Sequence, residues 1–439
     1  MSVYDAMLRR LQLPETSERL RMLYGSRPEM LQYQLSRYTG AVKRHQALFS
    51  ASDGPLYLIS APGRAEIAGN HTDHQNGRVL AAAVNLDMLC AVSPRDDLCV
   101  RLLSEGYPLI DMDISAHDPV EAERGTTAAL IRGIAKGMLD EGRAIRGFDA
   151  VVQSDVLSGS GLSSSAAFEV LIAAVFDTLF PSDRPLDAVR RARIAQCAEN
   201  VYFGKPSGLL DQMAASLGGL SSIDFQSKTP AVEPLQFSFE QVGYRMIVVD
   251  THGSHDQLTG EYAAIRDEMT AVAHACGAQV LRSVTREQVI GGIGHLRRDC
   301  GDRAVLRALH FFEEDERVDC QVRNLREGRL SEFLSGIVES GESSWMLLQN
   351  VHMPGTAQPL SLALAIARTL LKGRGAWRVH GGGFAGTTLN FVPDDLAPAF
   401  ISAMESAFGA GCCYQLDVRP VGPALVQKAF VEEETHEQY

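Results

Sequence analysis

Leucine residues at helical spacing mark the first fifty positions of the chain. They fall in pairs three or four residues apart, namely Leu8 and Leu11, Leu20 and Leu23, and Leu31 and Leu35. Residues at this spacing lie on one face of an α-helix. The pattern therefore predicts two or three short helices within residues 1–50.

From Leu56 onward the chain changes to short apolar runs that are separated by Gly, Pro and Asp, a pattern typical of strands. The runs are LYLIS, VLAAAVNL, LCAVSP and DLCVRLLS. Further along, the spacing predicts a helix over 127–139, a strand over 148–156 and a helix over 164–179. We therefore expect a mixed sheet with helices packed on it.

A stretch that contains prolines, residues 227–239, is the best boundary between two halves of the chain. The second half combines helical patterns at 262–276, 328–340 and 360–371 with strand patterns at 244–250, 377–379, 387–392 and 415–420. This combination predicts an α+β protein. We expect an N-terminal helical extension (1–50), a first domain (51–226) and a second domain (227–439).

Charge and composition narrow the classes of partner. The chain has 439 residues, and 41 Lys and Arg against 54 Asp and Glu give a net charge of −13, which disfavours binding to nucleic acid or to anionic membranes. Nothing at residues 1–10 reads as a secretory signal, and no apolar stretch is long enough to span a bilayer. The eight cysteines include no CxxC pair. We expect a cytoplasmic protein with reduced thiols, small-molecule ligands and a monomeric or weakly dimeric state.

The segment SGSGLSSSAA, at residues 158–167, lies between a predicted strand and a predicted helix. Gly159 and Gly161 allow a tight turn, and the serines from Ser163 place N–H and hydroxyl donors at the start of the helix, which suits a phosphate group. It is not a Walker A loop, because no Lys follows in the required frame. A flexible linker is the alternative, but the flanking strand and apolar helix argue against it.

A second segment, APGRAEIAGNHTDHQNG at residues 61–77, gathers polar side chains on a Gly- and Pro-containing loop. They are Arg64, Glu66, Asn70, His71, Asp73, His74 and Asn76. Such a set suits hydrogen bonding to a polyhydroxylated ligand. A solvated loop is the alternative, and a metal site formed by His71, Asp73 and His74 is a weaker one, because neighbouring loop residues do not automatically converge on one ion.

Two later segments complete the set. SGLLDQMAASLGG (207–219) places Asp211 near the start of a predicted helix, where the helix N-terminus and an Arg keep a carboxylate ionised. A simple capping role is the alternative for Asp211, as a surface position is for Glu199, twelve residues earlier. VHGGGFAGTTLNF (379–391) has four glycines that let a loop approach a ligand or the first glycine loop, or only turn tightly between strands.

Together and in this order, the four segments resemble the GHMP small-molecule kinase superfamily and, within it, the galactokinase family. PGRAEIAGNHTDHQNG is similar to the galactokinase signature, GSGLSSSAA to the phosphate loop, GLLDQ to the catalytic-aspartate motif and GGGFAG to the third motif. The resemblance covers about residues 35–422. It implies an ATP-dependent sugar 1-kinase with a ribosomal-S5-like N-terminal domain, a ferredoxin-like C-terminal domain and an active site between them.

The resemblance also implies a role for individual residues. Asp211 would face the anomeric hydroxyl group of the sugar with Arg64 beside it, and Ser165 and Glu199 would assist Mg²⁺. Whether Asp211 removes the hydroxyl proton or mainly orients the hydroxyl group stays open. The implied ATP-binding residues are Gly159, Ser160, Gly161, Leu162, Ser163, Ser164 and Ser165. The implied sugar contacts are Glu66, Asn70, His71, Asp73, Gly208 and Tyr262.

Some positions depart from the family pattern. The family usually has Asn, Glu and Tyr where this chain has Glu66, Asn70 and His74, and Thr where it has His380 near the phosphates. The usual Glu contacts the 6-hydroxyl group of the hexose; Asn70 loses the charge but can still form hydrogen bonds. Galactose is therefore the first expected substrate. The alternatives are a galactose relative altered at C6 or L-arabinose, and a catalytically silent sugar sensor.

Overall fold

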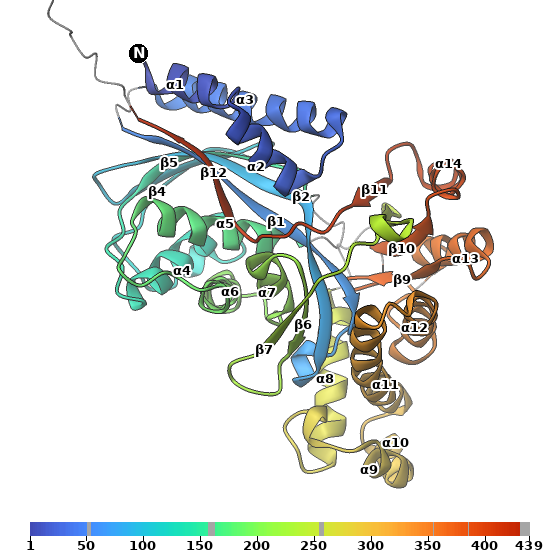
Figure 1. The fold of residues 1–439 in the computed structure, drawn as a ribbon. Coiled ribbons are helices and arrows are strands. Elements are labelled where there is room, and N and C mark those ends of the chain that lie inside the picture. Colours follow the sequence, from blue (N-terminus) through green and yellow to red (C-terminus); the bar gives the residue numbers. More distant parts are fainter. Residues whose placement is uncertain (51–53, 157–162, 254–258, 354, 385, 431–439) are drawn as a thin grey trace, which may run out of the picture.

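Two β-sheets with helices packed against them make up the molecule (Figure 1). The computed structural model describes residues 1–50, 54–156, 163–253, 259–353, 355–384 and 386–430. The first sheet has eight strands and the second has four, which confirms the predicted α+β class. All eight cysteines are free. No helix of the described part is long and apolar enough to cross a lipid bilayer.

Three helices precede the first strand: α1 (Val3–Arg10), α2 (Pro14–Tyr24) and α3 (Pro28–Phe49). The Ser2 side chain accepts a hydrogen bond from the Asp5 N–H group at the start of α1, and a proline lies in the first turn of α2 and of α3. Both features favour a helix N-terminus. The helices predicted before residue 50 are confirmed, although α3 extends over 22 residues and is not short.

The first sheet has the strand order β12-β1-β2-β5-β3-β4, with β6 added to β2 and β7 to β6. The pairs are antiparallel except for β3 and β5. The strands are β1 (Leu56–Ala68), β2 (Arg78–Pro94), β3 (Cys99–Ser104), β4 (Ile110–Asp113), β5 (Phe148–Ser154), β6 (Leu220–Asp224), β7 (Ala231–Leu235) and β12 (Ala424–Ala429). Because β12 pairs with β1, the end of the described chain returns to the first sheet.

Both faces of the first sheet are covered (Figure 1). Along β2, Leu89 and Ala91 pack with α1–α3, whereas Cys90 and Val92 pack in the core on the other face. That face is covered by α4 (Thr127–Asp140), α5 (Ser164–Leu179), α6 (Ala188–Cys197) and α7 (Leu210–Leu217). A sheet buried on both sides needs apolar residues at every position, which explains the continuous apolar runs in the sequence.

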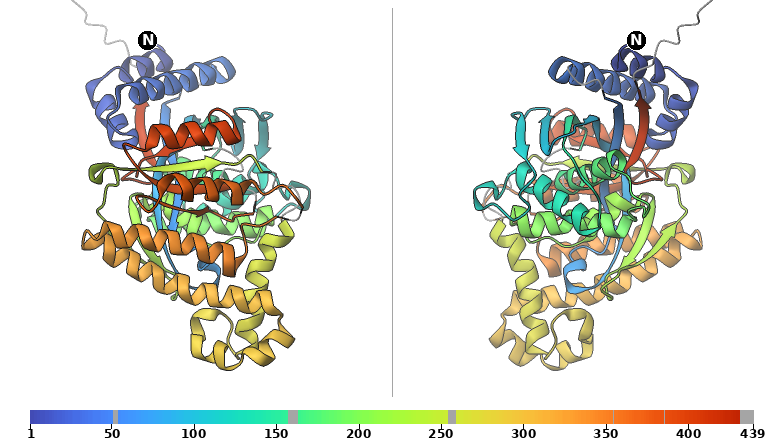
Figure 2. Two further views of the ribbon diagram at one scale, coloured as in Figure 1. Left: turned by 90° about the vertical axis from the view of Figure 1, so that its right-hand side faces the viewer. Right: turned by 90° about the vertical axis from the view of Figure 1, so that its left-hand side faces the viewer.

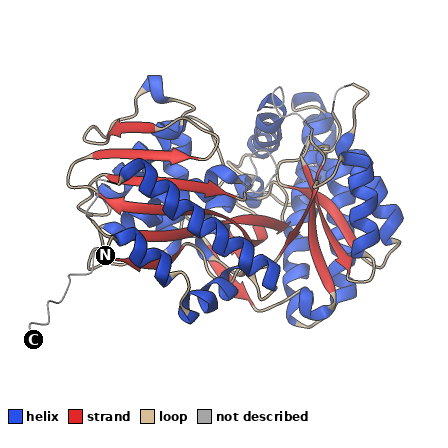
Figure 3. Cartoon of the chain, turned by 90° about the horizontal axis from the view of Figure 1, so that it is seen from above, coloured by secondary structure: helices blue, strands red, loops and turns tan. Residues whose placement is uncertain are grey.

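The second sheet is antiparallel with the order β11-β8-β10-β9. Its strands are β8 (Tyr244–Asp250), β9 (Ala376–His380), β10 (Thr387–Pro393) and β11 (Cys413–Leu416). The helices α13 (Pro359–Leu371) and α14 (Ala397–Phe408) pack on one face, and α12 (Leu330–Ser343) on the other. Seen from above, the two sheets lie side by side with helices around them (Figure 3).

A group of helices projects at the end of the molecule opposite α1–α3 (Figure 2). It contains α8 (Thr259–Ala275), α9 (Arg286–Gly291), α10 (Ile293–Asp299) and α11 (Asp302–Arg326). The helical pattern at 262–276 corresponds to α8, whereas no pattern predicted α11, which has 25 residues. The shorter helical turns are η1 (Asp73–Gln75), η2 (Glu121–Glu123), η3 (Ala198–Phe203), η4 (Glu240–Val242), η5 (Leu281–Ser283) and η6 (Ser344–Leu348).

Candidate active site

An ion pair between Asp211 and Arg64 lies at the centre of the site. Asp211 is in the first turn of α7, and Arg64 is on β1. Nε of Arg64 donates to Oδ1 of Asp211 at 2.7 Å, and Oγ of Ser163 donates to Oδ2 at 2.6 Å. The structure thus brings together one residue from each of three sequence motifs that are up to 147 positions apart.

The surroundings keep the carboxyl group of Asp211 ionised. Burial by itself raises its pKa, but the guanidinium group of Arg64 and the hydrogen bonds from Arg64 and Ser163 outweigh burial, so that the pKa of Asp211 lies below its ordinary value. One third of the side chain, 33%, is exposed. Asp211 is therefore an ionised, oriented acceptor that a ligand can reach.

The phosphate-loop prediction is only partly within the described chain. Gly159, Ser160, Gly161 and Leu162 lie outside the described residues. Ser163 precedes α5 with a φ of 59°, which is in the left-handed region and is rare for Ser. Ser164 and Ser165 form the first turn of α5, where backbone N–H groups have no partner within the helix and favour an anion.

Glu199 lies on the π-helical turn η3, and its side chain is 3% exposed. Oε1 accepts from Oγ of Ser165 at 3.0 Å and forms an ion pair with Nζ of Lys205 at 2.9 Å. Oε2 accepts from Oγ of Ser207 at 2.5 Å and from Nε2 of Gln212 at 2.9 Å. Four donors from three segments, namely α5, residues 204–209 and α7, therefore fix the carboxylate.

The donor chemistry at Glu199 fits Mg²⁺. The Ser165 hydroxyl and the Glu199 carboxylate present oxygen atoms 3.0 Å apart, and oxygen ligands are those that Mg²⁺ prefers. Within the described segments, no group of three or more His, Cys, Asp or Glu residues could hold a metal ion. The site therefore suits a cation that takes one or two ligands from the protein and the others from phosphate and water.

A second buried carboxyl group, Glu169, lies behind Glu199 and was missed in the sequence analysis. It is on α5, it is fully buried, and Nε2 of Gln212 bridges it to Glu199 with bonds of 3.0 and 2.9 Å. Burial, and then the charge of Glu199, raises the pKa of Glu169 well above its ordinary value. The available signal was a single Glu inside the apolar run AAFEVLIAA.

Two of the predicted sugar contacts, His71 and Tyr262, bond to the glycines of the third motif. The ring Nε2 of His71 donates to the carbonyl oxygen of Gly382 at 3.1 Å, and the Tyr262 hydroxyl donates to the carbonyl oxygen of Gly383 at 2.9 Å. A Cβ atom on Gly382 would lie 2.3 Å from the Tyr262 ring. The glycines of the third motif therefore permit close packing against His71 and Tyr262.

Asp73 and Gly208 form the second pair of predicted sugar contacts. A Cβ atom on Gly208 would lie 1.7 Å from Oδ2 of Asp73, so only glycine leaves room for this carboxylate. Burial raises the pKa of Asp73 to about 6, and the charges of Asp211 and Glu66 add to the increase. The backbone N–H groups of Leu210 and His74 bond to the same carboxylate and oppose the shift.

Glu66 and Asn70 are held by the protein itself. Glu66 lies on β1, not on a loop as predicted, and its Oε1 accepts from Nη2 of Arg378 at 2.7 Å and from Nδ2 of Asn70 at 2.8 Å. Nδ2 of Asn70 also donates to the Gly381 carbonyl oxygen at 2.8 Å, while its Oδ1 accepts from Asn350 at 2.9 Å. Asn70 is fully buried, so contact with a ligand would require these bonds to be exchanged.

The two histidines that depart from the family pattern are also enclosed. Burial, and then the charges of Arg64 and Arg378, lowers the pKa of His380 well below its ordinary value, and its Nε2 accepts from the Glu66 N–H group at 3.2 Å. His380 is thus neutral and adds no positive charge. Neither ring nitrogen of His74 has a hydrogen-bond partner within the described residues, and burial lowers its pKa strongly.

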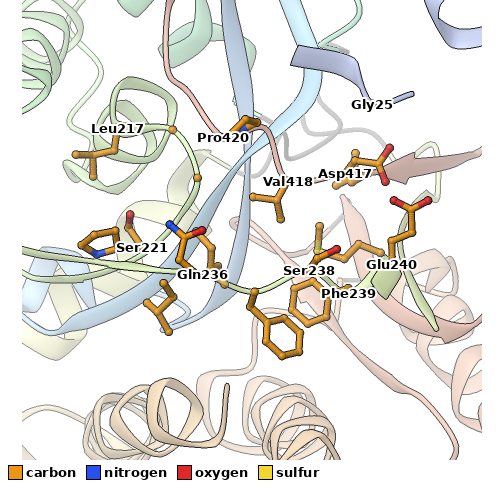
Figure 4. A pocket seen from close by; sticks show the side chains of 18 of the residues that line it. Gly25, Leu217, Ser221, Gln236, Ser238, Phe239, Glu240, Asp417, Val418 and Pro420 are labelled. Carbon is orange, nitrogen blue, oxygen red and sulfur yellow. The ribbon is translucent and has the colours of Figure 1, made fainter. Parts of the chain in front are cut away.

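A cavity of about 480 Å³ lies away from these residues (Figure 4). Its wall includes Gly25 after α2, Leu217 at the end of α7, Phe239, and Asp417, Val418 and Pro420. None of the predicted site residues lines it. The cavity is therefore separate from the Arg64–Asp211 pair.

Two family profiles match segments of the chain that contain candidate site residues. The profile described as the galactokinase galactose-binding signature matches residues 43–94, and that of the GHMP kinase N-terminal domain matches residues 129–219. The galactokinase of Actinobacillus pleuropneumoniae is 31% identical over 347 residues, which are 76% of this chain and 85% of that protein. The galactokinase of Streptomyces coelicolor is 31% identical over 373 residues, 84% and 92% of the two chains.

Solved structures show the same fold. Lactococcus lactis galactokinase complexed with galactose aligns with a TM-score of 0.75 at 22% identity, covering 87% of this chain and 98% of that one. Methanococcus jannaschii mevalonate kinase aligns with a TM-score of 0.59 at 13% identity, covering 82% and 98%. At these identities the match establishes the two-domain GHMP kinase fold.

Proposed function

The chain belongs to the galactokinase family of the GHMP kinases, and we propose that it transfers the terminal phosphate group of ATP to the anomeric hydroxyl group of galactose. The products are galactose 1-phosphate and ADP. The observation that supports the proposal most directly is the Arg64–Asp211–Ser163 cluster, which joins the sugar signature, the aspartate motif and the end of the phosphate loop within bonds of 2.6–2.7 Å.

In this proposal Asp211 accepts a hydrogen bond from the anomeric hydroxyl group and holds its oxygen toward the phosphate. Arg64 fixes Asp211 through the bond at Oδ1 and adds positive charge near the transferred group. Phosphoryl transfer depends mainly on in-line positioning and on neutralisation of charge, and both demands fit this pair. The N-terminus of α5, from Ser163, supplies N–H donors for the phosphates.

The proposal includes a binding site for Mg²⁺. Ser165 and Glu199 would hold Mg²⁺ through hydroxyl and carboxylate oxygens, and the bound ion would neutralise phosphate charge. Ser207 and Gln212 orient the Glu199 carboxylate, because each donates to its second oxygen. Glu169 lies behind Gln212 and supports that side chain.

We assign the sugar contacts to His71, Asp73, Gly208 and Tyr262. Asp73 offers carboxylate oxygens to sugar hydroxyl groups, and Gly208 keeps the space that the carboxylate needs. Glu66 and Asn70 would support these contacts without touching the sugar, because the Glu66 side chain bonds to Arg378 and the Asn70 side chain bonds to Gly381 of the third motif. A sugar altered at C6 is the second candidate substrate, because the Asn70 amide is already engaged by protein partners.

The test is the release of ADP by purified protein with Mg-ATP and, in turn, galactose, N-acetylgalactosamine, L-arabinose, fucose, glucose or no sugar. We expect the highest turnover with galactose. Turnover only with another sugar would replace galactose in the proposal. Sugar binding without any ADP release would contradict the assignment as a kinase.

The variant Asp211→Asn tests the central residue. It keeps the size of the side chain; its amide oxygen can still accept from Arg64, and its NH₂ group can donate to the Ser163 hydroxyl oxygen, so we expect little change in melting temperature and nucleotide affinity. Turnover should fall by about 10²-fold or more, because the charged acceptor for the sugar hydroxyl is lost. Asp395→Asn, at a side chain that is 61% exposed, is the matched control. Retention of most turnover in Asp211→Asn would refute the role of Asp211.

The proposal also includes three general properties of the protein: a cytoplasmic location, a monomeric or weakly dimeric state, and a division of the chain into two domains near residue 227. Light scattering during size-exclusion chromatography measures the oligomeric state directly. A stable trimer or larger assembly would contradict it.

A further inference from the structure

Lys205 is a positively charged residue at the candidate metal site, where it pairs with Glu199. It lies on the segment between η3 and α7, and so between Glu199 and Asp211 in the sequence. Its Nζ is 2.9 Å from Oε1 of Glu199, the same oxygen that accepts from Ser165 at the start of α5. The ammonium group therefore stands beside the phosphate-binding end of α5.

The ion pair joins two side chains in very different surroundings. The side chain of Lys205 is 58% exposed, whereas that of Glu199 is 3% exposed. Glu199 also accepts hydrogen bonds from Ser165, Ser207 and Gln212, so its carboxylate stays oriented without the lysine. Because more than half of the lysine side chain is exposed, its ammonium group can reach another partner through solvent, whereas the buried Glu199 carboxylate then needs a replacement positive charge.

Three carboxylates act electrostatically on the ammonium group of Lys205. The carboxylates of Glu199, Glu169 and Asp211 all act on Lys205 and raise its pKa, although burial of its head group opposes the increase. The charge of Lys205 in turn contributes to the lowered pKa of Asp211. Lys205 is thus within electrostatic reach of both the candidate metal ligand and the residue that faces the sugar.

We propose that the ammonium group of Lys205 moves from Glu199 to the terminal phosphate group of ATP and stays on that group while it is transferred. A metal ion on Glu199 would supply the positive charge that Lys205 gives up there. Arg64 is tied to Asp211 from one side, and Lys205 would neutralise the transferred group from the other. The inference rests on the proposed kinase function and adds one phosphate-binding residue to it.

The test compares a nucleotide that has the terminal phosphate with one that lacks it. Lys205→Gln can still donate a hydrogen bond to Glu199 but has no charge, and Lys205→Arg keeps the charge. Lys136→Gln is the matched control, since Lys136 forms an exposed ion pair with Asp140 on α4. Calorimetry with Mg²⁺ measures the affinities for ADP and for a non-hydrolysable ATP analogue, and steady-state kinetics gives kcat and both KM values.

For Lys205→Gln we expect an affinity for the ATP analogue that falls about 10-fold while that for ADP is unchanged, as the loss of one charge-assisted hydrogen bond requires. We expect kcat to fall by about 10²-fold with little change in the KM for the sugar. Lys205→Arg should recover most of both losses, and Lys136→Gln should match the wild type.

Equal weakening of ADP and the analogue in Lys205→Gln, with a lowered melting temperature, would mean that Lys205 only neutralises Glu199, and would overturn the inference. Wild-type affinities and turnover in Lys205→Gln would overturn it as well. Absence of sugar-dependent ADP release by the wild-type protein is a separate outcome, which contradicts the proposed function instead.

Discussion

Replacing Gly208 by alanine tests whether the Asp73 carboxylate must occupy its observed place. A Cβ atom at residue 208 would lie 1.7 Å from Oδ2, 2.7 Å from Cγ and 3.2 Å from Oδ1 of Asp73. Non-bonded carbon and oxygen atoms approach no closer than about 3 Å, so the two groups must separate by about 1.3 Å. The backbone at Gly208 is not in the left-handed region, so the effect is purely one of space.

Asp73 cannot move away from the added methyl group easily, because backbone hydrogen bonds hold its carboxylate in place. Its carboxylate bonds to the backbone N–H groups of Leu210 and His74, and Leu210 is next to Asp211. Either Asp73 leaves these donors or the segment that carries Asp211 moves. A displacement of about 1 Å at a reacting group can cost about 10²-fold in rate, and we expect a loss of this size in kcat/KM for the sugar with Gly208→Ala.

The assay is steady-state kinetics with the sugar as the varied substrate, together with thermal unfolding. Gly294→Ala is the control, because nothing lies within 4 Å of the added atom on α10 and alanine favours a helix. In an Asp73→Ala background the contact is absent, so Gly208→Ala should then have almost no further effect. Wild-type kinetics for Gly208→Ala, or an equal loss in the Asp73→Ala background, would refute the reasoning.

Two further predictions concern pH and stability. Burial, together with the charges of Asp211 and Glu66, raises the pKa of Asp73 to about 6, so its carboxylate is protonated below that pH. We therefore expect kcat/KM for the sugar to fall as the pH drops through 6, and we expect this fall to disappear in Asp73→Asn. The same fall in Asp73→Asn would contradict the assignment of this pH dependence to Asp73. Asp87 is fully buried; it accepts from Tyr24 at 2.5 Å and pairs with Arg37 at 2.9 Å and with the fully buried Arg419 at 3.5 Å. Asp87→Ala should lower the free energy of unfolding by about 3–5 kcal/mol, because Arg419 loses this buried carboxylate and Arg37 keeps only Asp155. Asp96→Ala, at an exposed ion pair, should leave denaturant unfolding unchanged, and an equal effect of both variants would contradict the second prediction.

The elements predicted correctly from the sequence include two that are built on nearly continuous apolar, buried runs. The helix predicted over 164–179 is α5, and the strand predicted over 148–156 is β5. The missed helix α11 has a buried face that includes Arg307, His310, Glu314 and Gln321, and these interrupt the apolar period. The structure gives the reason for two of them: Glu314 accepts from the N–H group of Gly69 at 2.9 Å, and His310 donates to the Asn70 carbonyl oxygen at 3.0 Å.

The candidate site could be located by its motifs but not completed from them. Arg64, Asp211 and Ser165 lie within motifs that carry the resemblance, and Glu199 lies eight residues before the third of these segments; the structure pairs Arg64 with Asp211 and Ser165 with Glu199. The carboxylate of Glu66 is paired with the guanidinium group of Arg378, 312 residues away in the sequence, so no local sequence pattern could predict this ion pair. The partial burial of Lys205 against Glu199 is likewise a product of the folded segment between η3 and α7.

The lowered pKa of Asp211 bears on how the sugar hydroxyl group loses its proton. Arg64 and Ser163 stabilise the ionised carboxylate, so in the proposed mechanism we expect Asp211 to orient the hydroxyl group and not to remove its proton before phosphoryl transfer begins. The hydroxyl oxygen becomes acidic only as its bond to phosphorus forms, and in a loose transition state that bond forms late. A weak, well-oriented acceptor is sufficient at that point, because the proton is then driven off by the new bond. The greater demand falls on the groups that neutralise the phosphate, so on this reasoning Lys205→Gln should reduce the chemical step itself and not only the binding of the nucleotide.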